Sequence, residues 1–168
     1  MSNLERYQRK SIKLNYDEIK DAINSSTSTT GIYIGCDSQR VGKTESGFPY
    51  IRVYVTCVII HHDGNKGASI YKSVDFRQDF DNLRLTLSDE AGDAINVAVE
   101  LQEAIGDRPF EIHLDINPDP RFKSSAVVKE AMGYVYGMLG IKAKIKPEAF
   151  AASTAADHFA KQRKFKRI

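Results

Sequence analysis

The order of strand-like and helix-like segments is the feature that most limits how this chain can fold. Three segments rich in Ile, Val, Tyr or Thr come first, at residues 31–36, 50–60 and 68–76. After them, helix-like and strand-like segments alternate to the end of the sequence. Successive short strands predict an antiparallel meander, and the later alternation predicts parallel crossovers in the same sheet.

The alternating half begins where the apolar spacing becomes that of an amphipathic helix, which Ser88 can cap and which runs to Ile105. Further elements are expected in this order: strand 110–116, a helix opened by Ser124 or Ser125 and ending at Met138, strand 141–145, and a helix from 148 to the end. Residues 40–49 contain two glycines and are expected to form a loop or hairpin turn. The order predicts an α/β fold of the ribonuclease H-like type, with a five-stranded mixed sheet and helices on both faces.

The N-terminal segment differs in composition from the rest. Residues 1–29 are polar and predict a short helix at 17–23 followed by a Ser/Thr linker, so the main domain is expected at 30–168, with a basic C-terminal tail. The first residues lack the apolar stretch of a signal peptide, and no apolar run approaches the ~20 residues needed to span a bilayer. The expected location is therefore cytoplasmic, without a membrane partner. Cys36 and Cys57 are expected to be reduced core residues.

The net charge of +2 hides a strong asymmetry along the chain. Residues 75–119 carry twelve acidic and three basic side chains, whereas residues 120–168 carry eleven basic and three acidic ones. Patches of opposite sign in one domain suggest one surface for cations and another for polyanions. Two solvated faces without a ligand are the alternative interpretation.

Two aspartates follow the apolar parts of predicted strands. Asp37 comes after the apolar segment 32–36, and Asp115 closes the strand that begins at residue 110. Neighbouring strands lie about 5 Å apart, so two such carboxylates would repel unless a cation lay between them. Glu90 lies near the border of the apolar face of the following helix, in its first turn. Each residue could be a turn or capping residue, but together they favour a site for an oxygen-ligated ion such as Mg²⁺.

Three stretches of the sequence carry a resemblance to a known family. They are residues 32–39, 112–117 and 144–157. They resemble the YkuK-type family of predicted ribonuclease H-like nucleases, and the resemblance covers about residues 30–160. It implies that Asp37 and Asp115 are metal-site aspartates. The segment around Asp157 is similar to the one that carries the last metal-site aspartate of true ribonucleases H, and Glu90 takes the remaining helix position.

By this resemblance, four residues would be catalytic and would bind two Mg²⁺ or Mn²⁺ ions: Asp37, Glu90, Asp115 and Asp157. The implied reaction is hydrolysis of phosphodiester bonds in RNA or in an RNA/DNA hybrid rather than in duplex DNA. A ribonuclease H-like domain that binds nucleic acid or protein without hydrolysis is the alternative function. Nothing in the sequence indicates the oligomeric state.

Basic residues near the C-terminus predict contacts with phosphate groups. Three of them alternate along the predicted fifth strand and would project from one side of it: Lys142, Lys144 and Lys146. Five more lie among the last eight residues: Lys161, Arg163, Lys164, Lys166 and Arg167. Such residues bind a nucleic-acid backbone without reading its sequence. For the terminal group, a solubilising tail is the alternative.

Overall fold

A four-stranded mixed sheet forms the centre of the fold in the computed structural model, which describes residues 1–162. The strands lie in the order β3-β2-β1-β4. Their bounds are Gly31–Lys43 for β1, Tyr50–His61 for β2, Ala68–Asp79 for β3 and Phe110–Leu114 for β4. The first three form the predicted antiparallel meander, and β4 pairs in parallel with β1. Runs of β-branched and aromatic residues explain why these segments are extended.

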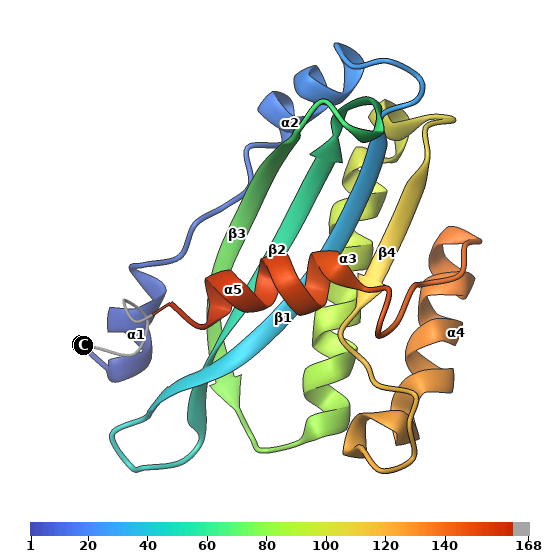
Figure 1. Ribbon diagram of the computed structural model, residues 1–168. Coiled ribbons are helices and arrows are strands. Elements are labelled where there is room, and N and C mark those ends of the chain that lie inside the picture. The colour runs from blue at the N-terminus through green and yellow to red at the C-terminus, as the bar shows by residue number, and fades with distance from the viewer. Residues whose placement is uncertain (163–168) are drawn as a thin grey trace.

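Helices lie on both faces of the sheet, as predicted (Figure 1). The α-helices are α1 (Asn3–Gln8), α2 (Tyr16–Asn24), α3 (Leu83–Ile105), α4 (Val128–Leu139) and α5 (Asp157–Ala160). Three short helices of other types are η1 (His62–Gly64), η2 (Lys123–Val127) and η3 (Ala151–Ala156). In Figure 1, α3 runs behind the sheet, while η3 and α5 cross its front. Among residues 1–162, no helix combines the length and the apolar character that crossing a membrane requires.

The alternation of side chains along β1 and β2 supplies two apolar cores. On one face, residues such as Ile34 pack with the buried side of α3, for example Ile95 and Leu101. On the other, Val55 and Phe76 belong to a smaller cluster with Ala156 and other small residues from η3 and α5. Both faces of the sheet are thus covered by helices.

The prediction of a fifth strand at residues 141–145 is wrong, since the sheet has four strands among the described residues. Segment 141–146 runs beside β4, but only one isolated parallel bridge forms, between His113 and Lys144. Lys144 exchanges two backbone hydrogen bonds with the β4 backbone, and Lys146 donates one more to Ile116 O. The peptide before Pro147 ends this pairing, because proline has no N–H to continue it.

Several boundaries also differ from those predicted. β3 extends to Asp79, β4 ends at Leu114, and the helix expected from Ser124 or Ser125 begins as η2, with α4 starting at Val128. β1 continues to Lys43 rather than ending at residue 36, because its polar second half pairs with β2. The helix expected after Ser88 is α3, and it begins at Leu83 because the Asn82 side chain caps it by accepting a hydrogen bond from the Leu85 N–H. The helix expected from residue 148 to the end is shorter: it begins as the π-helix η3 and ends with α5 at Ala160. The part of this prediction that covers residues 163–168 lies outside the described residues.

The N-terminal segment contributes to both cores. The short helix predicted at 17–23 is α2, and its residues Ile19 and Ile23 are fully buried against α3. The helix α1 was not predicted, and its Tyr7 is buried in the smaller core, where its hydroxyl donates to Val41 O. The boundary at residue 29 stays a prediction.

Candidate metal centre

Asp37 and Asp115 lie at the point where the pairing of two parallel strands ends. The last paired residues of β1 and β4 are Cys36 and Leu114, and each aspartate follows one of them. β4 stops because the chain turns away towards Pro118, whereas β1 continues beside β2. The two carboxylates are therefore neighbours at this edge of the sheet, as the sequence predicted.

Glu90 reaches the same region from α3. It lies in the second turn of this helix and is buried, and the Ser38 hydroxyl donates a 2.5 Å hydrogen bond to its Oε1. Ser38 follows Asp37 on β1, so its side chain projects from the opposite face of the sheet, where α3 lies. Glu90 therefore lies on the α3 face of β1, close enough to Asp37 for the two charges to repel.

Asp157 is brought to β1 by close backbone packing. A Cβ at Gly35 would lie 2.5 Å from Ala152 N and 2.6 Å from the Ala151 carbonyl carbon, so only glycine lets η3 approach this closely. The buried His113 side chain fixes the start of η3, because its Nδ1 accepts a 3.0 Å hydrogen bond from Ala151 N–H. Asp157, the first residue of α5, is thus held within reach of Asp37.

A cleft of about 470 Å³ opens at this edge of the sheet, and Asp37, Glu90 and Asp115 all line it. Arg52, Asp79 and Lys123 line other parts of its wall. Asp157 is not among the lining residues. Three of the four predicted carboxylates thus line one cleft, and the fourth, Asp157, contacts Asp37.

The electrostatics of the cluster favour a bound cation. Burial, the contact with Asp157 and the charge of Asp115 together raise the pKa of Asp37 to about 7, and burial is the largest of these causes. Burial also raises the pKa of Glu90 well above its usual value, with repulsion from Asp37 as the next cause. Crowded and buried carboxyl groups lose their protons only at higher pH. A nearby positive charge stabilises their anionic form.

The donor set fits a hard divalent ion. All four groups are carboxylates, the ligands that Mg²⁺ and Mn²⁺ prefer. Asp37 Oδ2 is buried without a hydrogen-bond partner, which is costly unless another ligand occupies it. The side chains do not yet converge: within residues 1–162, no three His, Cys, Asp or Glu groups are placed to bind a single ion together. Binding at this position would therefore require side-chain rotation around Asp37.

Two lysines neutralise the outer carboxylates of the cluster. Lys146 Nζ lies 2.7 Å from Asp115 Oδ1, although the angles are not those of a hydrogen bond. Lys161 Nζ lies 2.7 Å from Asp157 Oδ2, and this contact raises the lysine pKa. Each ammonium group would compete with a metal ion for the carboxylate oxygen that it contacts.

The predicted basic residues that the structure describes have different partners. Lys144 lies 3.5 Å from Glu148, Lys146 contacts Asp115, and Lys142 is exposed. Lys161 pairs with Asp157. The remaining four predicted residues lie outside the described part of the chain: Arg163, Lys164, Lys166 and Arg167.

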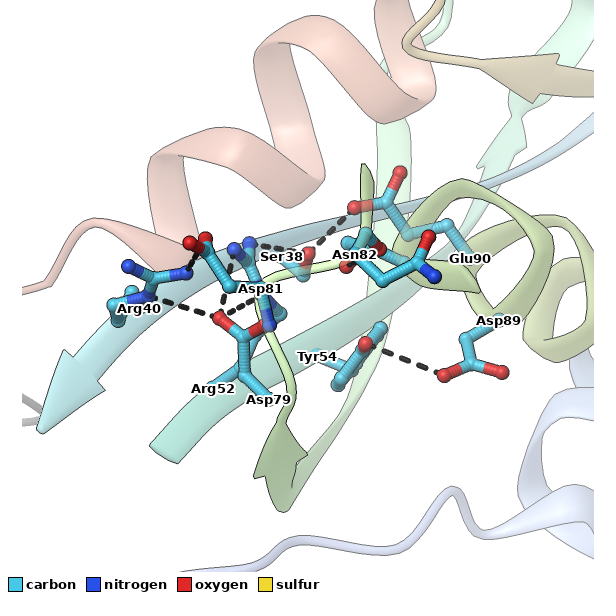
Figure 2. A network of polar contacts seen from close by, with 10 residues as sticks. Ser38, Arg40, Arg52, Tyr54, Asp79, Asp81, Asn82, Asp89 and Glu90 are labelled. Atoms are coloured by element: carbon cyan, nitrogen blue, oxygen red, sulfur yellow. Dashed lines mark hydrogen bonds and ion pairs between the residues drawn. The ribbon is translucent and has the colours of Figure 1, made fainter. Parts of the chain in front are cut away.

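A polar network beside the cleft was not predicted from the sequence (Figure 2). Arg52 donates to Ser38 Oγ at 3.1 Å and to Asp79 Oδ2 at 3.1 Å. Arg40 donates to the same Asp79 oxygen at 2.9 Å. The network connects the end of β3 with Glu90 and restrains the Ser38–Glu90 hydrogen bond. Its members are far apart in sequence, and no local motif could have revealed them.

Comparison with known proteins gives one match. The ribonuclease H-like family model matches residues 15–161, which include all four predicted carboxylates. Neither the curated proteins nor the solved structures include a significant match. The meander, the parallel fourth strand and the carboxylates at its end agree with the family match and with the resemblance noted from the sequence. This chain belongs to the ribonuclease H-like family.

Proposed function

We propose that this protein is a metal-dependent nuclease that hydrolyses phosphodiester bonds in RNA or RNA-containing nucleic acid. The observation that carries the proposal is that Asp37, Glu90 and Asp115, from three separate parts of the chain, line one cleft. Such crowding of carboxylates is expected where divalent cations are bound. Family membership supports a role in nucleic-acid processing or binding, and the preference for RNA follows from the resemblance noted in the sequence.

The residues have separable tasks in this proposal. Asp37, Glu90, Asp115 and Asp157 would hold two Mg²⁺ or Mn²⁺ ions, which when bound supply an activated water and neutralise charge on the leaving oxygen. Ser38 and Arg52 orient Glu90 through the hydrogen bonds described above. Lys123 lines the cleft and provides a positive charge for the substrate backbone.

A second function is favoured by the two lysine contacts. If Lys146 and Lys161 keep their contacts with Asp115 and Asp157, half of the carboxylate set is neutralised without any metal. The domain would then bind nucleic acid or a protein without cleaving it. This alternative is the non-catalytic ribonuclease H-like domain.

A cleavage assay separates the two functions. End-labelled RNA, DNA and RNA/DNA hybrid are incubated with the protein in Mg²⁺ or Mn²⁺, and products are resolved by size. We expect metal-dependent cleavage by the wild type and a loss of at least about 100-fold in Asp37→Asn, because an amide cannot supply the charge that holds the ions. Asp107→Asn, an exposed carboxylate beyond the end of α3, is the matched control and should cleave normally.

Each other outcome has a definite meaning. Cleavage by Asp37→Asn at the wild-type rate would place the activity at another site or in a contaminant. Binding of nucleic acid by a wild-type protein that cleaves none of the substrates would support the non-catalytic alternative.

A further inference from the structure

Three aromatic side chains gather at the end of the sheet beyond the cleft. Phe48 precedes β2, Tyr50 begins it, and Phe80 follows the last residue of β3. The ring of Phe48 meets those of Tyr50 and Phe80 edge-on, at centroid distances of 5.6 and 6.1 Å. We call these three residues the aromatic platform.

The platform is not part of either apolar core. Phe48 and Phe80 keep 50% and 52% of their surface exposed, and neither belongs to the buried clusters or the residues packed against them. Single exposed apolar residues are common, but adjacent large rings left open to solvent indicate a binding surface. Aromatic rings are rigid and planar, so they can stack on a planar group of a ligand with little loss of conformational entropy.

Cations accompany these rings. The guanidinium carbon of Arg40 lies 3.8 Å from the centre of the Tyr50 ring, and Lys43 Nζ lies 5.9 Å from it. Asp79, the last residue of β3, is almost fully buried between Arg40 and Arg52, so it presents little negative charge to solvent. Asp81 is exposed but pairs with Arg40. Two cations, Arg40 and Lys43, thus lie against the platform, and they favour an anionic ligand with flat apolar groups.

The platform is continuous with the candidate metal centre. Asp79, Asp81 and Arg52 line the cleft that also contains Asp37, Glu90 and Asp115. The hydrogen bonds from Arg40 through Asp79 and Arg52 to Ser38 and Glu90 run from one to the other, and Figure 2 shows this connection. A polymer with a phosphodiester at the carboxylates would therefore extend over the rings.

We propose that the aromatic platform stacks unpaired bases of a single-stranded nucleic acid bound across the cleft. Bases inside a duplex are covered by their neighbours, so only an unpaired strand presents base faces to aromatic rings. An apolar protein segment would not explain the cations that flank the rings, whereas a polyanion with planar bases explains both. The proposal rests on the proposed function only for where the substrate phosphate lies.

Binding without turnover tests the platform separately from catalysis. Fluorescence anisotropy in EDTA would measure the affinity for a labelled single-stranded RNA of twelve nucleotides and for a blunt duplex of the same sequence. The double variant Phe48→Ala/Phe80→Ala should bind the single strand about tenfold more weakly or worse, because each lost stack removes a substantial share of affinity. Its affinity for the duplex should stay within about twofold of wild type.

Two further variants separate stacking from apolar contact and from general surface loss. Phe48→Leu/Phe80→Leu keeps apolar bulk but removes the ring faces, so it should lose single-strand affinity nearly as much as the alanine variant. Tyr136→Ala removes a ring on α4 that is 59% exposed, and it should bind like wild type. All variants should melt within a few degrees of wild type, since the replaced rings lie outside both cores.

The outcomes are distinct from those of the cleavage assay. Wild-type affinity of the alanine variant for the single strand would overturn the proposal, and so would equal losses on single strand and duplex. Full affinity of the leucine variant would also overturn it, because apolar contact rather than stacking would then explain binding. A platform-dependent loss in a protein that cleaves nothing would leave this inference intact and reject the nuclease proposal.

Discussion

Asp37 and Asp115 each follow one residue of Cys36–Leu114, the last pair of the β1–β4 ladder, so the two carboxylates lie side by side. Parallel strands in register bring equivalent positions side by side. Burial and mutual repulsion follow from this placement, and they raise the pKa of Asp37 to about 7. Crowding of these carboxylates therefore lowers the stability of the metal-free protein, and pKa values perturbed in this way are common at functional sites.

Asp37→Asn should stabilise the metal-free protein. The variant removes a buried carboxylate that Asp115 and Asp157 repel. At pH 8 in EDTA, we expect thermal denaturation to show a rise in Tm of about 4–8 °C, which corresponds to about 2 kcal/mol in the free energy of unfolding. Asp107→Asn should leave Tm unchanged. A lower Tm for Asp37→Asn would show that this carboxylate is held by favourable contacts.

The raised pKa of Asp37 also predicts how the stability of the wild type, relative to Asp37→Asn, changes with pH. The pKa of Asp37 lies at about 7 in the folded protein against an ordinary value of 3.8, so the folded state retains a proton that the unfolded chain releases. The wild type should therefore lose stability as pH rises from about 4 to 7, and the loss should level off above that range. Denaturant unfolding across this range should show the stability gap to Asp37→Asn widening with pH. A constant gap would contradict the raised pKa.

Much of the fold could be predicted from local patterns. The apolar runs located the four strands, and the change of period located α3 and α4. Glu90 was expected at the border of the apolar face and in the first turn of its helix, but it is buried in the second turn because α3 begins at Leu83. Asp115 was expected to close a strand over residues 110–116, and it lies directly after β4, which ends at Leu114. The elements themselves could be located because burial imposes a regular spacing on the sequence.

Other features depend on contacts that no local pattern records. β1 extends past Asp37 to Lys43 because β2 offers paired backbone groups to its polar residues. Segment 141–146 has the alternation of a strand, but only one residue forms a bridge to β4. Asp79 is buried because Arg40 and Arg52 meet it from two other strands.

Lys146→Gln should strengthen divalent-ion binding. The Lys146 ammonium group lies 2.7 Å from Asp115 Oδ1 and competes for this oxygen with any cation. Titration calorimetry with Mn²⁺ should give an affinity roughly three- to tenfold higher than that of wild type, a modest gain because the lysine is partly exposed. Lys144→Gln, whose partner Glu148 is exposed, is the control and should not change affinity. Weaker binding by Lys146→Gln would place the ion away from Asp115.

Gly35→Ala should destabilise the protein and displace η3. The new Cβ would lie 2.5 Å from Ala152 N, and a backbone contact of this kind cannot be relieved by a side-chain rotation. We expect a loss of about 1–3 kcal/mol in the free energy of unfolding, measured by denaturant titration. Gly133→Ala, inside α4 with no atom within 4 Å of the added Cβ, should instead be neutral or slightly stabilising. Equal effects of the two substitutions would refute the close approach of η3 to β1.

The basic C-terminal residues predict the salt dependence of nucleic-acid binding. We expect the combined replacement of Arg163, Lys164, Lys166 and Arg167 by Ala to weaken binding uniformly across sequences. On a single strand, each lost phosphate contact should lower the slope of log affinity against log salt by about 0.7. Lys20→Ala, a cation on α2, should leave the slope unchanged. An unaltered slope in the fourfold variant would identify these residues as a solubilising tail.

The central claim is that the carboxylates at the end of the β1–β4 ladder bind divalent metal. Crystals soaked in Mn²⁺ and measured near the manganese absorption edge test it most directly, because anomalous scattering locates the ion without reference to activity. We expect a strong anomalous peak in contact with Asp37 and Asp115 in wild-type crystals, and no peak at this position in crystals of Asp37→Asn. A wild-type map with no peak between these carboxylates at millimolar Mn²⁺, or with the only peak elsewhere on the protein, would contradict it.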